Sequence, residues 1–193
     1  MTCETWHIGL VQQLFDRCVT GDGQAWRELY RAFYPTACRF LTRIRLKSAD
    51  LDDVCQDVFI HIFRYLPRFQ DRSDFQTWLY RLCLSQAARL HRTRKLQTAL
   101  GRLWGRTRES ASSGQTWSED MANQRVQQIL DRMRPLHRQV FVLFELEDLE
   151  GDEIARILGC PAATIRRRLH YARQEFQALL CGDGHGEGKT HEQ

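Results

Sequence analysis

The sequence predicts an all-α protein made of two small helical domains joined by a flexible linker, the second a helix-turn-helix. Apolar residues recur at intervals of three and four along most of the 193-residue chain, which is the period of an amphipathic helix. Nothing in the chain resembles a strand meander or an alternation of strands with helices. Between residues 98 and 118 glycines and serines interrupt the helical pattern, and such a composition is typical of a linker.

The first domain is predicted over residues 1–97. Its clearest helix follows the apolar stripe from Leu51 to Leu66, with Asp50 expected as the N-cap and Pro67 as the stop. Before it, the apolar residues of segment 26–44 predict two helices, or one helix interrupted near Pro35. A further helix is expected over residues 78–90.

The second domain is predicted over residues 119–181 and contains the most specific pattern in the chain. If Gly151 is the first position of a helix-turn-helix, Ala155 is the fifth, Gly159 the ninth and Ile165 the fifteenth. Helices that cross at a steep angle need a small residue at their contact, and the turn needs a residue that tolerates left-handed dihedrals. Residues 182–193, with four glycines and no large apolar side chain, are expected to be disordered.

The second helix of this motif is predicted to bind DNA. Its outward side carries arginines, which neutralise phosphates and can bind a guanine edge in the major groove. The alternative is a helical hairpin with an ordinary basic surface. The candidate DNA-binding residues on this side are Thr164, Arg166, Arg167, His170 and Tyr171.

An acidic surface is predicted on the helix of the first domain that spans residues 51–66. It lies opposite the apolar stripe, and an aliphatic residue at its edge favours docking of a basic protein partner. A solvated structural face is the alternative, whereas a catalytic carboxylate pair is not expected. The residues concerned are Asp52, Asp53, Gln56, Asp57 and Ile60.

Aromatic and basic residues occur together around segment 67–74. No acidic residue lies between Phe75 and Arg108, whereas eight are basic. Aromatic rings stack on unpaired bases and cations follow a single strand, so the combination suits an opened DNA strand. Several of the rings fit a protein core equally well. The aromatic residues are Tyr65, Phe69, Phe75, Trp78 and Tyr80.

The seven cysteines predict a reduced, cytoplasmic protein. Their number is odd and no Cys-x-x-Cys pair is present, so neither a disulfide scaffold nor a structural zinc site is expected. Most fall on apolar helix sides, where a thiol behaves as a small hydrophobe. Only Cys181, near His185 and His191, suggests weak metal or redox chemistry. No metal, cofactor, export signal or membrane insertion is expected.

Three motifs together resemble the ECF (extracytoplasmic function) sigma factors of bacterial RNA polymerase. They read DDVCQDVF over residues 52–59, FQTWLYR over 75–81, and DEIA over 152–155 with TIRRRLHYAR over 164–173. The resemblance covers both domains in order, from about residue 10 to residue 180.

The resemblance implies a non-enzymatic protein that directs core RNA polymerase to promoters and helps to open the duplex. It implies that Asp53, Gln56, Asp57 and Ile60 bind the β′ clamp helices. The second domain would rest on the β flap and read the −35 element through Pro161, Arg166, Arg167, His170 and Tyr171. The linker would thread toward the polymerase active site and the RNA-exit path. An anti-sigma factor is implied as a regulatory partner. The −10 element would be read by segment 67–74 and by Arg81, Ser85, Arg89 and Arg92.

The chain departs from the family at positions that set sequence preference. Ser85 stands where the family often has Asn, and Arg167 and Tyr171 stand where it often has Ser and Arg. The promoter sequence therefore cannot be carried over. Glu150 replaces a common Ser cap, at an expected cost of about 1 kcal/mol.

Two other interpretations compete with the resemblance. An ordinary helix-turn-helix regulator, whose first domain dimerises or senses a ligand, predicts tight duplex binding by the protein alone and a two-fold operator. A redox- or metal-sensing protein built on the cysteines, His185 and His191 requires paired ligands, which the sequence does not show.

Overall fold

The computed structural model describes residues 8–69, 75–103 and 121–182. Every element in these ranges is helical, which confirms the predicted all-α class. The chain forms two compact units, one of residues 1–41 and 47–113 and one of residues 42–46 and 114–193. None of the described helices is long and apolar enough to cross a membrane.

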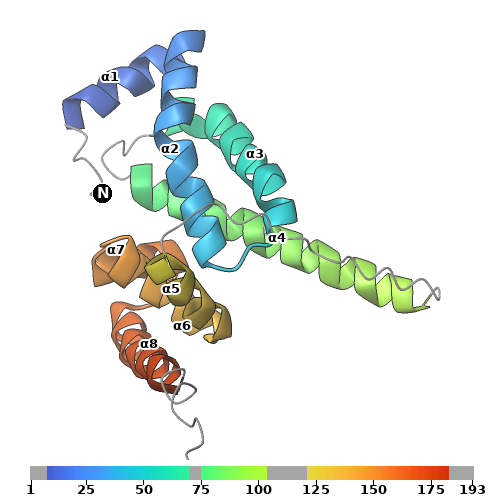
Figure 1. Cartoon of the computed structure of the whole chain (residues 1–193). Coiled ribbons are helices and arrows are strands. Elements are labelled where there is room, and N and C mark those ends of the chain that lie inside the picture. The colour runs from blue at the N-terminus through green and yellow to red at the C-terminus, as the bar shows by residue number, and fades with distance from the viewer. Residues whose placement is uncertain (1–7, 70–74, 104–120, 183–193) are drawn as a thin grey trace, which may run out of the picture. The chain divides into compact units, whose positions relative to one another are not determined.

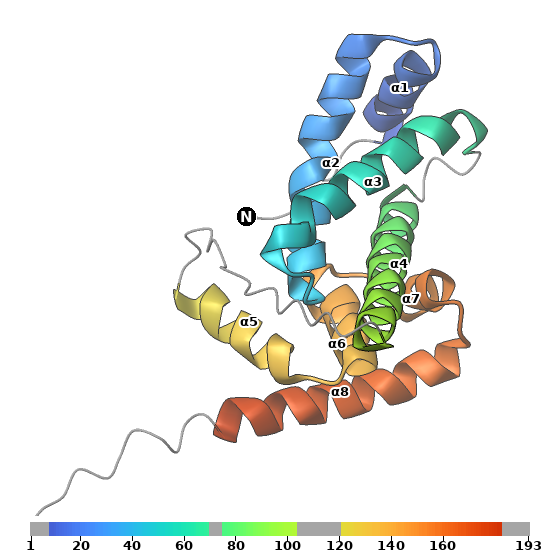
Figure 2. The ribbon, with the colours of Figure 1, turned by 90° about the vertical axis from the view of Figure 1, so that its right-hand side faces the viewer.

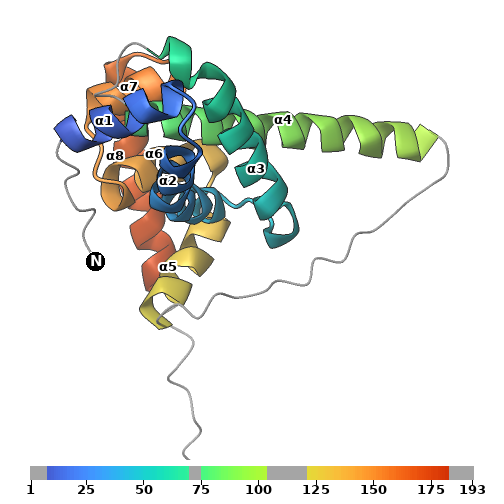
Figure 3. The same ribbon diagram turned by 90° about the horizontal axis from the view of Figure 1, so that it is seen from above.

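The described residues of the first unit form four α-helices and one turn of 3₁₀-helix. The long helix α4 packs against α3, and its C-terminal half extends beyond α1, α2 and α3 (Figures 1 and 3). Residues 98–103, which the sequence assigned to the linker, belong to this helix, and residues 104–118 lie outside the described ranges. The elements are α1 (Ile8–Val19), α2 (Gly23–Arg43), α3 (Ser48–Tyr65), η1 (Leu66–Arg68) and α4 (Phe75–Leu103).

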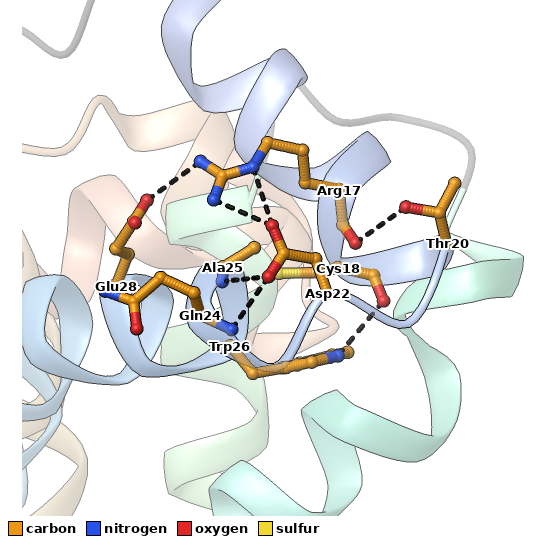
Figure 4. Close-up of polar contacts among 8 residues, drawn as sticks. All are labelled: Arg17, Cys18, Thr20, Asp22, Gln24, Ala25, Trp26 and Glu28. Carbon is orange, nitrogen blue, oxygen red and sulfur yellow. Dashed lines mark hydrogen bonds and ion pairs between the residues drawn. The ribbon is translucent and has the colours of Figure 1, made fainter.

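Asp22 begins α2 by capping its N-terminus (Figure 4). Its Oδ1 accepts hydrogen bonds from the backbone N–H groups of Gln24 at 2.8 Å and Ala25 at 3.2 Å. The Arg17 guanidinium donates to Asp22 and, at 3.0 Å, to Glu28. The hydrogen bond from Arg17, with those from the two backbone N–H groups, lowers the pKa of Asp22. This network joins the end of α1 to the start of α2.

Helix α2 continues through Pro35 without a break, so the expected interruption is wrong. A proline inside a helix removes one backbone hydrogen bond and costs about 3 kcal/mol. Leu29 before the proline and Phe40 after it are both completely buried. Burial of apolar side chains on both sides of Pro35 therefore offsets the local cost.

The N-cap expected at Asp50 is also wrong. Helix α3 begins at Ser48, after Lys47 at the N-cap position, which makes no side-chain capping hydrogen bond. Asp50 therefore lies in the first turn, where its side chain is buried. Its carboxylate forms an ion pair with Arg94 of α4. A charge removed from water needs such a partner, and the pair fastens α3 to α4. The expected stop holds, because Pro67 follows the end of α3 within η1.

The second unit places its longest helix, α8, against α5, α6 and α7 (Figure 2). Its core is formed by apolar residues of every element, among them Leu130, Leu143, Ile154 and Ile165. The tail from residue 183 onward lies outside the described ranges. The elements are α5 (Met121–Arg132), α6 (Pro135–Phe141), the π-helix η3 (Val142–Leu146), α7 (Gly151–Leu158) and α8 (Ala162–Gly182).

Helices α7 and α8 form the predicted helix-turn-helix. Gly159 follows α7 with φ 62°, in the left-handed region, as the spacing predicted. The N-terminus of α7 forms a capping box, in which the Glu150 side chain accepts from the backbone N–H of Glu153 and the backbone N–H of Glu150 donates to Glu153 Oε2 at 2.8 Å. Replacement of the family's Ser by Glu150 therefore does not leave this helix start without a side-chain cap.

Glu175 holds α8 against the start of α6. Its carboxylate accepts hydrogen bonds from the backbone N–H and the guanidinium of Arg134, at 2.9 and 3.2 Å. The ring Nδ1 of His137 lies 2.5 Å from Glu175 Oε2. Burial raises the pKa of Glu175, but these three hydrogen bonds outweigh burial and lower it. The orientation of α8 thus depends on a half-buried carboxylate between two helices.

We predict that Gly159→Ala lowers the free energy of unfolding by about 1 kcal/mol, because an alanine in the left-handed region is strained. A Cβ at Gly159 would meet nothing within 4 Å, so the cost comes from the backbone alone. Gly151→Ala is the matched control, since Gly151 has no positive φ and the same open surroundings. Urea unfolding followed by circular dichroism measures both variants. Equal effects of the two substitutions would contradict the conformational explanation.

We predict that Glu175→Gln lowers the free energy of unfolding by about 1–2 kcal/mol at pH 7, because charge-assisted hydrogen bonds are lost. The folded-state pKa of Glu175 is lowered, so its contribution is present above the ordinary Glu pKa of about 4.3 and disappears as the pH falls through the folded pKa. Wild type and variant should therefore converge in acid.

The control is Glu145→Gln, which makes the same change at a more exposed ion pair with Arg173. Exposed pairs contribute little, so its effect on urea unfolding at pH 7 should be less than half as large. A difference between wild type and Glu175→Gln that persists in acid would show that the carboxylate charge is not responsible.

Candidate polymerase and DNA interfaces

The acidic face of α3 comprises the five residues predicted from the sequence, and all five are exposed. The opposite side of the helix is buried, with Val54, Cys55 and Val58 at 4% exposure or less. Because burial fixes the rotation of the helix, the whole acidic set is presented to solvent together. The acidic face consists of Asp52, Asp53, Gln56, Asp57 and Ile60.

Aromatic contacts with α2 hold α3 in this orientation. Trp26 packs on Phe63 and Tyr30 packs on Phe59, each with ring centroids 4.7 Å apart. The Tyr34 hydroxyl donates to Asp52 Oδ1 at 3.0 Å. Residues further along α2 contact residues earlier in α3, so the two helices pack antiparallel.

Exposed apolar side chains adjoin the acidic face. Ile60 is 41% exposed, and Phe63, which the sequence placed in the buried stripe, is 59% exposed. The stripe prediction failed there because the position lies at the stripe's edge, where periodicity does not distinguish core from rim. Acidic groups beside exposed apolar surface are typical of a protein-docking site.

The cationic face of α4 consists of residues spaced by four, four and three positions, which places them on one side of a helix. All of them are exposed, whereas Leu82, Cys83 and Ala87 on the other side are buried. Arg94 belongs to the same basic run, but it is engaged in the ion pair with Asp50. The cationic face is made of Arg81, Ser85, Arg89 and Arg92.

Two of the five aromatic residues predicted to stack on bases are part of the core. Phe75 and Tyr80 are 3% and 0% exposed, so the base-stacking interpretation is wrong for them. Phe69 and Trp78 are half-buried and stack on each other with centroids 4.5 Å apart. Tyr65 is 41% exposed. Of the segment 67–74, residues 70–74 lie outside the described residues.

The recognition face is the outward side of α8 with the residue before it. Its members are exposed except Thr164, which is half-buried, while Ile165, Leu169 and Ala172 are buried as predicted. Tyr171 leans toward α6, where its ring lies parallel to that of His137 at 6.3 Å. The recognition face consists of Pro161, Thr164, Arg166, Arg167, His170 and Tyr171.

The described cysteines are reduced thiols, and three of them, Cys18, Cys55 and Cys83, are buried. Cys181 is exposed at the end of α8, but His185 and His191 lie outside the described residues. In the part of the chain that the structure describes, no three His, Cys, Asp or Glu side chains are arranged to hold a metal ion.

Several structural contacts were not foreseen from the sequence. They include Asp50 with Arg94, Glu175 with the start of α6, and the close approach of Cys38 to Cys55 at 3.1 Å. Of these contacts, only the one made by Asp50 left a signal in the sequence. Asp50 is a charged residue at a position that the helical period assigns to the core, which indicates a buried ion pair.

Comparison with known proteins identifies the family. Sigma-70 region 2 matches residues 29–97, and sigma-70 region 4 matches residues 123–176. The ECF RNA polymerase sigma factor SigE of Mycolicibacterium smegmatis is 31% identical over 170 residues, 84% of this chain and 65% of that protein. The ECF RNA polymerase sigma-E factor of Escherichia coli K12 is 29% identical over 173 residues, 84% of this chain and 90% of that protein.

Solved structures share the fold. The Bartonella quintana sigma factor RpoE, crystallised with the anti-sigma factor NepR, superposes with a TM-score of 0.69 at 20% identity, covering 80% of this chain and 96% of that one. CnrH, in complex with the cytosolic domain of CnrY, gives a TM-score of 0.64 at 23% identity, covering 89% and 97%. With both sigma-70 regions in order and ECF factors as relatives, this chain belongs to the ECF RNA polymerase sigma factors.

Proposed function

We propose that this protein is a promoter-specificity subunit that recruits core RNA polymerase and helps to open the duplex, without catalytic chemistry of its own. The acidic face of α3 would bind the β′ clamp helices, and the second unit would rest on the β flap. The proposed setting is the bacterial cytoplasm, where the polymerase and the chromosome meet. The observation that carries the proposal is the exposure of three surfaces of suitable charge, in the family's order along the chain.

The charges of the three surfaces, on α3, α4 and α8, support these assignments. DNA binding depends on cations that neutralise phosphates, and the cationic face of α4 and the recognition face of α8 provide arginines for the −10 and −35 elements. Carboxylates at those positions would repel DNA, whereas on α3 they favour a basic protein surface. The proposed domain division assigns residues 1–103, which include the whole of α4, to polymerase and −10 binding, residues 104–118 to the connection, and residues 119–181 to −35 binding.

We further propose control by an anti-sigma factor that covers these surfaces. The structural neighbour RpoE was crystallised with the anti-sigma factor NepR, which supports this extension for a chain of the same fold. The exposed apolar residues Ile60 and Phe63 beside the acidic face supply the kind of surface that such a partner buries.

Run-off transcription with purified core polymerase on genomic promoter fragments tests the proposal. The expected result is initiation at defined promoters that requires both proteins, with weak duplex binding by this chain alone. Tight binding of a two-fold operator by the chain alone, without an effect on initiation, would instead indicate an ordinary helix-turn-helix regulator.

We predict that Asp57→Lys weakens binding to core polymerase at least tenfold, because it places a like charge against a basic partner. Adding Asp53→Lys should abolish binding. Asp16→Lys makes the same charge change at another exposed position of the first unit and should stay within about twofold of wild type. Fluorescence anisotropy of labelled protein titrated with core polymerase measures all three. A similar loss of affinity in Asp16→Lys would show that the effect comes from the net charge of the protein and not from the acidic face.

We predict that Arg166→Ala costs about 1–3 kcal/mol at one base pair of the −35 element if the guanidinium contacts a base. Transcription from a promoter library with each −35 position varied reveals where discrimination is lost. Arg125→Ala removes the same charge from an exposed position on α5 and should leave the preference unchanged. A uniform loss across all sequences would make Arg166 a phosphate contact.

A further inference from the structure

Two cysteines meet where α2 packs on α3. The Sγ atoms of Cys38 on α2 and Cys55 on α3 lie 3.1 Å apart, a distance at which one thiol hydrogen-bonds the other. Both are reduced. A disulfide has an S–S length of about 2.05 Å, so the sulfurs would need to approach by only about 1 Å to form one.

The surroundings of the two thiols are unequal. Cys38 is half-buried, whereas Cys55 is completely buried. Tyr34 lies one helical turn before Cys38, and its hydroxyl donates to Asp52, one turn before Cys55. Because Cys38 is the more exposed of the two, we expect a small oxidant from solvent to reach it before Cys55.

The more exposed thiol, Cys38, is also the more acidic of the two. The hydrogen bond with Cys55 lowers the pKa of Cys38 to about 7, although burial opposes this. The hydrogen bond with Cys38 and burial both raise the pKa of Cys55. Since the thiolate is the reactive form, Cys38 is suited to attack an oxidant and Cys55 to remain a protonated thiol until it resolves the product.

We propose that Cys38 and Cys55 form a peroxide-reactive dithiol that closes reversibly into a disulfide between α2 and α3. The Cys38 thiolate attacks a peroxide oxygen, the O–O bond breaks, and the departing hydroxide takes a proton to become water. The Cys55 sulfur then attacks the Cys38 sulfenic acid, the Cys55 proton and the sulfenic hydroxyl leave as a second water, and the S–S bond forms. Two thiols lose two electrons, and one hydrogen peroxide becomes two waters.

The position of the pair determines the effect of oxidation. Cys55 belongs to the buried side of α3, opposite the acidic face. The disulfide would therefore tie α3 to α2 without occupying the surface assigned to polymerase. On the proposed function, the oxidised protein keeps its affinity for core polymerase, and disulfide closure protects Cys38 from irreversible oxidation.

Peptide mapping of the full-length wild-type chain tests the dithiol directly. The reduced protein is treated with equimolar hydrogen peroxide at neutral pH, remaining thiols are blocked with N-ethylmaleimide, and digests are analysed without reduction. We expect a crosslink between the Cys38 and Cys55 peptides, with loss of two hydrogens, that dithiothreitol reverses. Oxidation of Cys181 alone, or a Cys38–Cys55 crosslink only in urea, would overturn the proposal.

The reaction should depend on pH and on both cysteines. The rate should fall roughly fivefold between pH 7 and pH 6, as the Cys38 thiolate is protonated. Cys55→Ser should leave a Cys38 sulfenic acid that dimedone traps, and Cys38→Ser should slow oxidation of Cys55 at least tenfold. Cys181→Ser, the control, should form the crosslink at the wild-type rate. An equal rate of Cys55 oxidation with and without Cys38 would contradict the assigned roles.

Two readouts separate this inference from the proposed function. Oxidised wild-type protein should melt roughly 5 °C or more above the reduced form, because the crosslink closes a loop in the unfolded chain. This measurement and the peptide map need no polymerase. Loss of polymerase binding on oxidation, with the crosslink formed, would refute only the statement that the acidic face stays available.

Discussion

Burial of one side of each helix determines which residues the molecule presents to its partners. On α3 the apolar stripe from Leu51 to Ile62 is inside, and the acidic face is outside as a consequence. On α8 the buried residues Ile165, Leu169 and Ala172 turn the arginines outward in the same way. Burying a large aliphatic side chain contributes about 1.5–3 kcal/mol, so rotating either helix to hide its charged side would cost several such contributions.

Helical periodicity was therefore sufficient to predict the fold class, the acidic face of α3 and the outward arginines of α8. The residues of the cationic face of α4 came instead from the family resemblance. The spacing of Ala155, Gly159 and Ile165 predicted the turn between α7 and α8 because that turn is local: its left-handed residue is set by positions a few residues away. The sequence was least informative at the margins of the stripes. Phe63 and Phe75 belong to the same residue type, but one is exposed and the other is core, since their burial depends on which helix packs above them.

Contacts between distant residues could not be predicted for the same reason. Asp50 and Arg94 are 44 positions apart, and Glu175 reaches Arg134 across 41 positions. No spacing rule joins such residues until the helices are placed. The ion pair with Asp50 also changes how the basic run of α4 is interpreted. Arg94 neutralises a buried carboxylate of the first unit, so it is not assigned to binding a polyanion. Pro35 is the opposite case. A proline is a strong local signal for a helix break, but burial of apolar side chains on both sides of it keeps α2 continuous.

The division of the chain into two compact units has a consequence for how the proposed promoter-binding protein would select a site. Each unit carries its own candidate DNA-facing helix, and one chain joins them. On the proposed function, binding of either unit to DNA would raise the effective concentration of the other, because one chain joins them. Modest affinities would then combine into avidity only where two DNA elements are correctly spaced.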